Sequence, residues 1–163
     1  MKVTIFLGSD SDFEVIKEGI ELLKEFGVPF DLEVTSAHRS PERTVRLIRE
    51  AEHQGTKVFI AVAGKAAHLP GVVAAHTVLP VIGVPVESQA LAGLDALLSI
   101  VQMPKGIPVA TVALGKTGGA NAALLAVSIL AAFDESLHRK LLDYRKKMAE
   151  KVEESSKKLK EKL

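Results

Sequence analysis

The 163-residue sequence contains no cysteine and no tryptophan. Without cysteine there can be no disulfide bond, no thiolate nucleophile and no cysteine-based zinc site. Aromatic residues make up only 4% of the chain, which argues against a protein that stacks nucleic-acid bases on aromatic side chains. The lack of cysteine is compatible with a reducing compartment, and we predict a cytoplasmic protein.

A strong net charge and a long apolar run are also missing. The formal net charge of +1 gives no strong field toward nucleic acid or a membrane surface, so neither is an expected partner. No apolar run reaches the roughly 20 residues of a membrane-spanning helix. The first predicted strand follows Met1 almost directly, so we expect no signal peptide. With 47% hydrophobic and 25% charged residues, the chain is predicted to form a single globular domain, residues 1–163.

Short apolar runs alternate with helix-forming segments along the chain. Strands are predicted at residues 3–7, 29–34, 58–63, 81–86 and 108–114. The first helix is predicted from Phe13, with Ser11 and Glu14 as a capping box. The glycine-rich segment 115–119 is expected to be a flexible turn. This alternation indicates an α/β fold with a parallel sheet of about five strands and right-handed crossovers.

The last two segments of the chain, residues 120–133 and 134–163, have apolar surfaces that need a packing partner. Residues 120–133 are apolar nearly all round, so they form either a central core helix or, as we favour, a homo-oligomer interface. Residues 134–163 predict a charged helix with one apolar stripe, made of Leu141, Tyr144, Met148, Val152 and Leu159. We expect this stripe to pack on the body of the protein or on a neighbouring subunit.

Polar clusters follow three successive predicted strands, at Ser9–Asp12, Ser36–Arg39 and Gly64–His68. The carboxyl ends of parallel strands meet at one edge of a sheet, where ligands bind, so we expect the clusters to converge. Together they offer hydroxyls and backbone N–H groups for a phosphate, a guanidinium, two imidazoles and a carboxylate.

Each cluster also has a purely structural interpretation. The turn Ser9–Asp12 fits an ordinary helix cap as well as it fits a phosphate and ribose site. His38 beside Arg39 favours proton transfer and phosphate binding over a loop that only caps a helix. His68 fits a structural histidine and a ligand contact equally well. No two histidines have zinc-site spacing and the carboxylates do not cluster, so we predict no metal.

Four motifs resemble one enzyme family. They occur in order between about Val3 and Leu130, at Gly8–Asp12, Ser36–Pro41, Ala66–Gly71 and Gln102–Pro108. Their sequences and spacing closely resemble those of the class I (carboxyamino)imidazole ribonucleotide mutases of bacterial purine biosynthesis, the phosphoribosylaminoimidazole carboxylase catalytic-subunit family. The resemblance implies a flavodoxin-like three-layer sandwich with a C-terminal helical extension. It also implies a homo-octamer with a ribonucleotide substrate and without a metal or organic cofactor.

The resemblance further implies a reaction. The carboxylate of an N5 carbamate moves to C4 of the imidazole, which gives 4-carboxy-5-aminoimidazole ribonucleotide for IMP biosynthesis without ATP. By position, His38 matches the catalytic histidine. The residues that would bind or enclose the substrate are Ser9, Ser11, Asp12, Ser36, Arg39, Gly64, Ala66, His68 and Leu69.

The chemistry can use these residue types. A carbamate loses carbon dioxide when its nitrogen is protonated, and a base must later take a proton from C4, so one imidazole can do both in turn. The site must also hold carbon dioxide beside the ring and exclude water. Two positions depart from the family: Lys65 stands where glycine is common, either altering the loop or adding a cation, and Glu87 stands where glutamine is common.

Two alternatives remain at this point. One is direct carboxylation of aminoimidazole ribonucleotide by carbon dioxide, although the loop His68–Pro70 favours the mutase. The other is a non-catalytic module of the same fold that binds a ribose phosphate.

Overall fold

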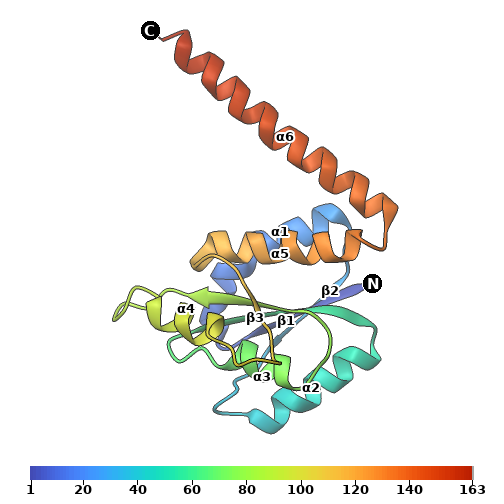
Figure 1. The fold of residues 1–163 in the computed structure, drawn as a ribbon, viewed down its shortest axis with the longest axis vertical. Coiled ribbons are helices and arrows are strands. Elements are labelled where there is room, and N and C mark those ends of the chain that lie inside the picture. Colours follow the sequence, from blue (N-terminus) through green and yellow to red (C-terminus); the bar gives the residue numbers. More distant parts are fainter. Residues whose placement is uncertain (163) are drawn as a thin grey trace.

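A computed structural model describes residues 1–162 of the chain (Figure 1). Its sheet has five parallel strands in the order β2-β1-β3-β4-β5. The strands are β1 (Lys2–Leu7), β2 (Phe30–Val34), β3 (Thr56–Gly64), β4 (Val81–Val86) and β5 (Ala110–Thr111). The predicted α/β fold with five parallel strands is confirmed, and β3 lies at the centre of the sheet.

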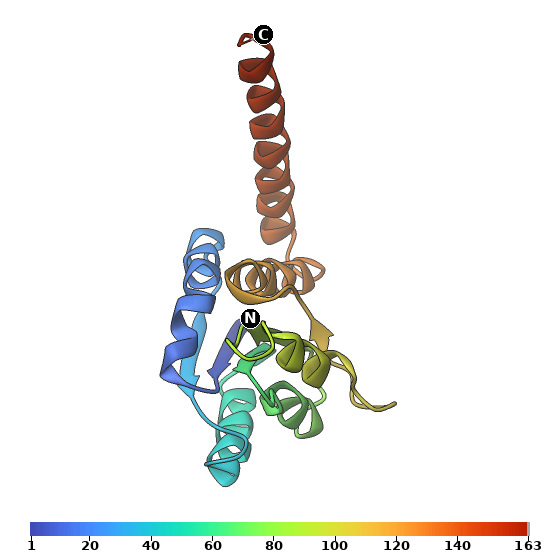
Figure 2. The same cartoon turned by 90° about the vertical axis from the view of Figure 1, so that its left-hand side faces the viewer.

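Helices cover both faces of the sheet, as Figure 2 shows. One face carries α1 (Phe13–Phe26) and α5 (Gly115–Ala131), and the other carries α2 (Pro41–His53), α3 (Leu69–Ala75) and α4 (Leu94–Val101). The alternation of side chains along a strand separates two cores. In β1, Val3, Ile5 and Leu7 face α1 and α5, whereas Phe6 stacks on Phe59 beneath α2 and α3. The predicted three-layer arrangement is therefore confirmed.

Three local predictions were wrong. Residues 115–119 are the first turns of α5 rather than a flexible turn, because Gly118 and Gly119 serve close packing. A Cβ at these positions would lie 1.7 Å and 1.9 Å from the carbonyl oxygens of Ala113 and Val15. The fifth strand pairs over only two residues at the sheet edge. The predicted capping box of Ser11 and Glu14 is absent, since a short 3-10 turn, Asp10–Asp12, precedes α1.

Helix α5 is largely a core helix of its own chain. Ala122, Ala126, Val127 and Leu130 are buried against α1 and the sheet. Leu124, Leu125 and Ile129 remain only partly buried. The core interpretation therefore accounts for most of the helix, and an oligomer interface on its remaining surface stays a prediction.

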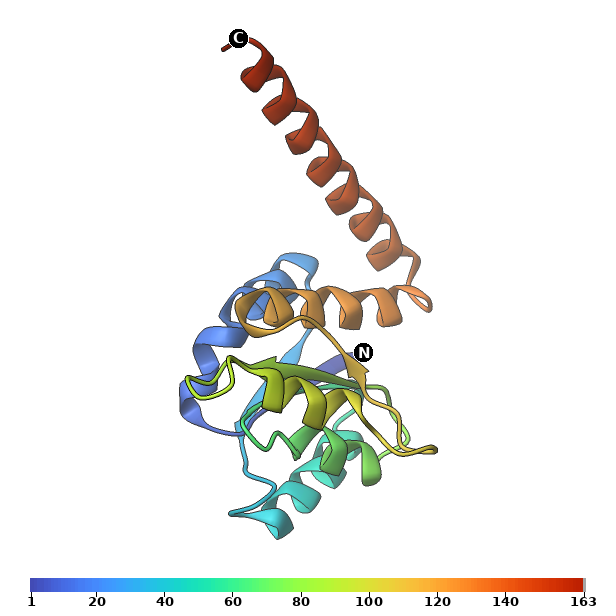
Figure 3. The same cartoon turned by 60° about the vertical axis from the view of Figure 1, so that its left-hand side comes forward.

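Helix α6 (Glu135–Lys160) leaves the body of the protein, as Figures 1 and 3 show. The Asp134 side chain caps its start by accepting the Leu137 N–H at 3.0 Å. Tyr144 packs on Phe26 with ring centroids 5.6 Å apart. The first part of the apolar stripe thus packs on the body, whereas Met148, Val152 and Leu159 are exposed.

The predicted end of this helix, Leu163, lies outside the described residues. No helix within residues 1–162 is both long enough and apolar enough to cross a membrane.

Candidate functional site

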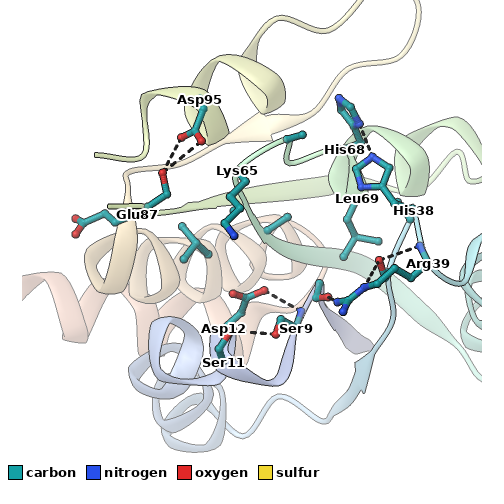
Figure 4. A pocket seen from close by; sticks show the side chains of 18 of the residues that line it. Ser9, Ser11, Asp12, His38, Arg39, Lys65, His68, Leu69, Glu87 and Asp95 are labelled. Carbon is teal, nitrogen blue, oxygen red and sulfur yellow. Dashed lines mark hydrogen bonds between the residues drawn. The ribbon is translucent and has the colours of Figure 1, made fainter. Parts of the chain in front are cut away.

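A cavity of about 1070 Å³ opens at the carboxyl ends of the central strands (Figure 4). It sits where the topology switches, because β2 and β3 flank β1 while the crossover helices α1 and α3 cover opposite faces. A parallel sheet binds its ligands in such a crevice. The three predicted clusters converge here, and the cavity is lined by Ser9, Ser11, Asp12, Ser36, His38, Arg39, Gly64, Ala66, His68 and Leu69. The roles of these residues remain predictions.

The Ser9–Asp12 turn is held together by its own polar groups. The backbone N–H of Ser9 donates to Asp12 Oδ2 at 3.0 Å, and the Ser11 hydroxyl donates to the Ser9 hydroxyl at 3.0 Å. Asp10 accepts from the Ser9 hydroxyl and from the Ser11 N–H, both at 3.0 Å. The turn therefore presents two linked hydroxyls at the start of α1, which suits an anion.

Asp12 is the buried carboxyl group of this turn, with 7% of the residue exposed. Burial raises the pKa of Asp12, the N–H of Ser9 opposes that rise, and the nearby charge of Asp10 adds to it. The bond to Ser9 fixes the carboxyl group in one orientation at the cavity wall. A carboxylate in that position can accept hydrogen bonds from ribose hydroxyls.

Arg39 connects the loop after β2 to the end of β1. Its Nη2 donates to the Gly8 carbonyl at 3.2 Å, and its Nε donates to the Ser36 hydroxyl at 3.4 Å. The Ser36 hydroxyl also accepts the backbone N–H of Arg39 at 3.2 Å. The two guanidinium bonds occupy two of five N–H donors and hold the group at the cavity edge, where it can bind a phosphate.

His38 and His68 meet across the mouth of the cavity. Nε2 of His38 lies 2.6 Å from Nδ1 of His68, and the two rings make an edge-to-face contact with centroids 4.8 Å apart. One of these nitrogens must carry a proton and the other must accept it. His68 is therefore tied to the predicted proton carrier, which its sequence context alone could not establish.

The loop between β4 and α4 also contributes to the cavity, although its sequence predicted no site residue. Glu87, Ser88 and Asp95 line the cavity there, and the Ser88 hydroxyl donates to the Asp95 carboxylate at 3.2 Å. The strand order could have predicted this, because β4 is a fourth parallel strand whose carboxyl end lies at the same edge of the sheet. Within residues 1–162, no group of three or more histidine or acidic side chains is placed to hold a metal ion.

Comparison with known proteins agrees with this geometry. The AIR carboxylase family matches residues 2–151. An N5-carboxyaminoimidazole ribonucleotide mutase from Pyrococcus horikoshii is 56% identical over 159 residues, which are 98% of this chain and 89% of that protein. One from Bacillus subtilis is 54% identical over 94% of this chain and 95% of that protein. The crystal structure of Treponema denticola PurE superposes with a TM-score of 0.88 at 32% identity, covering 96% of this chain and 97% of that one.

Proposed function

Since this chain belongs to the AIR carboxylase family, we propose that it is an N5-carboxyaminoimidazole ribonucleotide mutase of purine biosynthesis. Relatives that are 54–56% identical over nearly the whole chain carry that name, and the sequence motifs predicted the same reaction. The structural observation that supports it best is the paired imidazoles of His38 and His68 beside the Ser9–Asp12 turn and Arg39, in one cavity.

The phosphate of the substrate binds at the Ser9–Asp12 turn. The hydroxyls of Ser9 and Ser11, the start of α1 and the Arg39 guanidinium all reach this part of the cavity. Asp12 binds the ribose hydroxyls beside them. Binding energy from these unreactive groups then positions the imidazole for the reaction.

His38 moves the protons. As an acid, it donates a proton to the carbamate nitrogen, and the C–N bond breaks to release carbon dioxide. Ring carbon four then attacks the carbon dioxide, and the neutral His38 removes the proton from that carbon, so its own proton is restored. His68 accepts from or donates to His38 and orients its ring. Ala66 and Leu69 supply apolar wall that keeps carbon dioxide near the ring.

Turnover assays without ATP separate this reaction from its rivals. The mutase converts N5-carboxyaminoimidazole ribonucleotide directly. Turnover only of aminoimidazole ribonucleotide with carbon dioxide would instead support direct carboxylation, and binding without any turnover would support a ribose-phosphate module.

The variant His38→Asn tests the proton carrier. It should keep substrate affinity within about twofold and lose turnover by about 100-fold or more, because general acid–base catalysis contributes that much. Full activity in this variant would remove His38 from the mechanism. His53→Asn is a matched control, since His53 is an exposed histidine at the end of α2, outside the cavity.

The oligomeric state is part of the proposal. We expect a homo-octamer of single-domain chains, residues 1–163, in the cytoplasm. Support comes from exposed apolar side chains around α4 and along outer α6, namely Leu91, Leu94, Leu98, Val101, Met148, Val152 and Leu159. Light scattering should give eight times the 17.4 kDa of one chain. A monomer at micromolar concentration would contradict the octamer.

A further inference from the structure

Lys65 brings an ammonium group into the cavity. It follows directly after β3, the central strand, and it lines the cavity wall. In Figure 4 its side chain extends from the end of β3 into the cavity, in the direction of the turn that holds Asp12. A lysine in this place adds a positive charge to the cavity.

The backbone conformation at Lys65 is one that favours glycine. Its φ of 58° lies in the left-handed region, where a side chain is strained and glycine is not. Two backbone hydrogen bonds hold the loop in this conformation. The Ala67 N–H donates to the Lys65 carbonyl at 2.9 Å, and the His68 N–H donates to the Ala66 carbonyl at 2.8 Å. A strained residue at a site is a reason to ask what its side chain contributes.

Among the side chains of residues 1–162, the ammonium of Lys65 has no carboxylate partner. Within residues 1–162, no ion pair within 4.0 Å involves Lys65, although Asp12, Glu87 and Asp95 line the same cavity. Arg39, in contrast, is bound to the Gly8 carbonyl and to Ser36 beside the phosphate turn. In the described part of the chain, the cavity therefore holds Arg39 at the proposed phosphate site and a second cation, Lys65, that makes no ion pair.

The substrate of the proposed reaction carries two anionic groups, a phosphate and a carboxylate. We propose that Lys65 binds the migrating carboxylate, while Arg39 and the Ser9–Asp12 turn bind the phosphate. Lys65 is three residues from His68, which contacts His38, so its loop borders the reacting end of the site. This inference rests on the proposed function and assigns a substrate-binding residue that the sequence motifs left open.

The test compares two nucleotides that differ by the carboxylate. Calorimetry would measure the affinity of 4-carboxy-5-aminoimidazole ribonucleotide and of aminoimidazole ribonucleotide for wild type and for Lys65→Met. We expect Lys65→Met to weaken binding of the carboxylated nucleotide about tenfold, as loss of a charge-assisted hydrogen bond does, and to leave the other within about twofold. Lys65→Arg should restore the preference for the carboxylated nucleotide, because it keeps the charge.

Lys57→Met is the matched control. Lys57 is an exposed lysine at the opposite end of the same strand, outside the cavity, so its removal should change neither affinity. Equal weakening of both nucleotides by Lys65→Met, or no weakening of either, would overturn the inference while the proposed function stands. If the wild-type protein binds neither nucleotide, the proposed function fails and the inference falls with it.

Discussion

A methyl group at Gly119 has no room in this fold, so Gly119→Ala should destabilise the protein strongly. A Cβ there would lie 1.9 Å from the carbonyl oxygen of Val15 and 2.8 Å from its carbonyl carbon. Ordinary contact begins at 3.4 Å, so α1 and α5 must separate by about 1.5 Å. Gly19 makes the same approach from the other side, because a Cβ on it would lie 2.4 Å from the Gly119 oxygen.

The expected cost follows from what has to move. Overpacking a core typically costs about 1–3 kcal/mol when side chains can adjust. Here the neighbouring atoms are helix backbone, and separating the helices also loosens Ile16, Ala122 and Ala126, which are fully buried. We therefore expect a gross loss of about 3–5 kcal/mol. The better helix propensity of alanine returns about 1 kcal/mol, which leaves a net loss of about 2–4 kcal/mol.

Urea unfolding followed by circular dichroism measures this loss. With a slope of about 2 kcal/mol per molar urea, the midpoint should fall by about 1–2 M. Gly71→Ala is the control, because a Cβ there meets only the flexible end of Met103, at 3.2 Å, and should shift the midpoint by less than about 0.5 M. All variants are compared at one protein concentration, since association affects the midpoint. If Gly119→Ala unfolds within about 0.3 M of wild type, the helices are not in the backbone contact described here.

Three further predictions concern the cavity. Arg39→Ala should weaken phosphate-dependent binding about 10-fold to 100-fold by calorimetry, since a charged hydrogen bond is lost, and unchanged affinity would exclude Arg39 from the phosphate site. Burial raises the pKa of Asp12 in the folded protein above its ordinary value of 3.8, so the ionised carboxylate lowers the free energy of unfolding at pH 7. This loss of stability disappears as the pH falls through the raised pKa toward 3.8. Asp12→Asn should therefore raise Tm at pH 7, with a smaller gain in acid, while weakening nucleotide binding; a lower Tm at pH 7 would contradict the role of burial. Lys65→Gly should raise the free energy of unfolding by about 0.5–1 kcal/mol, because glycine removes the side-chain strain of the left-handed backbone and this gain exceeds the entropy cost of glycine. Equal or lower stability would mean that Lys65 is not strained.

The sequence predicts those parts of the fold that depend on local pattern. β1, β3 and β4 are each built around a short, mainly apolar run, so the sequence predicts their ends within two residues. The start of α5 could not be read in this way, because Gly118 and Gly119 look like turn residues until the backbone packed against each of them is known. Gly119 packs against Val15, about 100 positions away in the chain, whereas Gly118 packs against the nearby carbonyl of Ala113.

For the site too, the sequence predicts what depends on the order of the strands but not what depends on contacts between loops. Convergence of the three clusters follows from the rule for parallel sheets, and the cavity contains every residue predicted from them. The contact between His38 and His68 joins residues 30 positions apart and depends on the conformation of both loops. The left-handed backbone of Lys65 gives no signal in the sequence, because a lysine carries no preference for it.

Because α5 is synthesised after all the predicted site residues, its packing on the sheet must occur late during synthesis of the chain. Every predicted site residue lies within the first 69 positions, but the face of β1 and β3 beneath α1 is closed only by α5, which ends at Ala131. At about 5–20 residues per second, a ribosome needs about 3–12 seconds to travel from Leu69 to Ala131. During that interval the nascent chain holds every predicted site residue but not the helix that covers this face of the sheet. The core beneath α1 is therefore completed only after α5 has been made, well after the last predicted site residue.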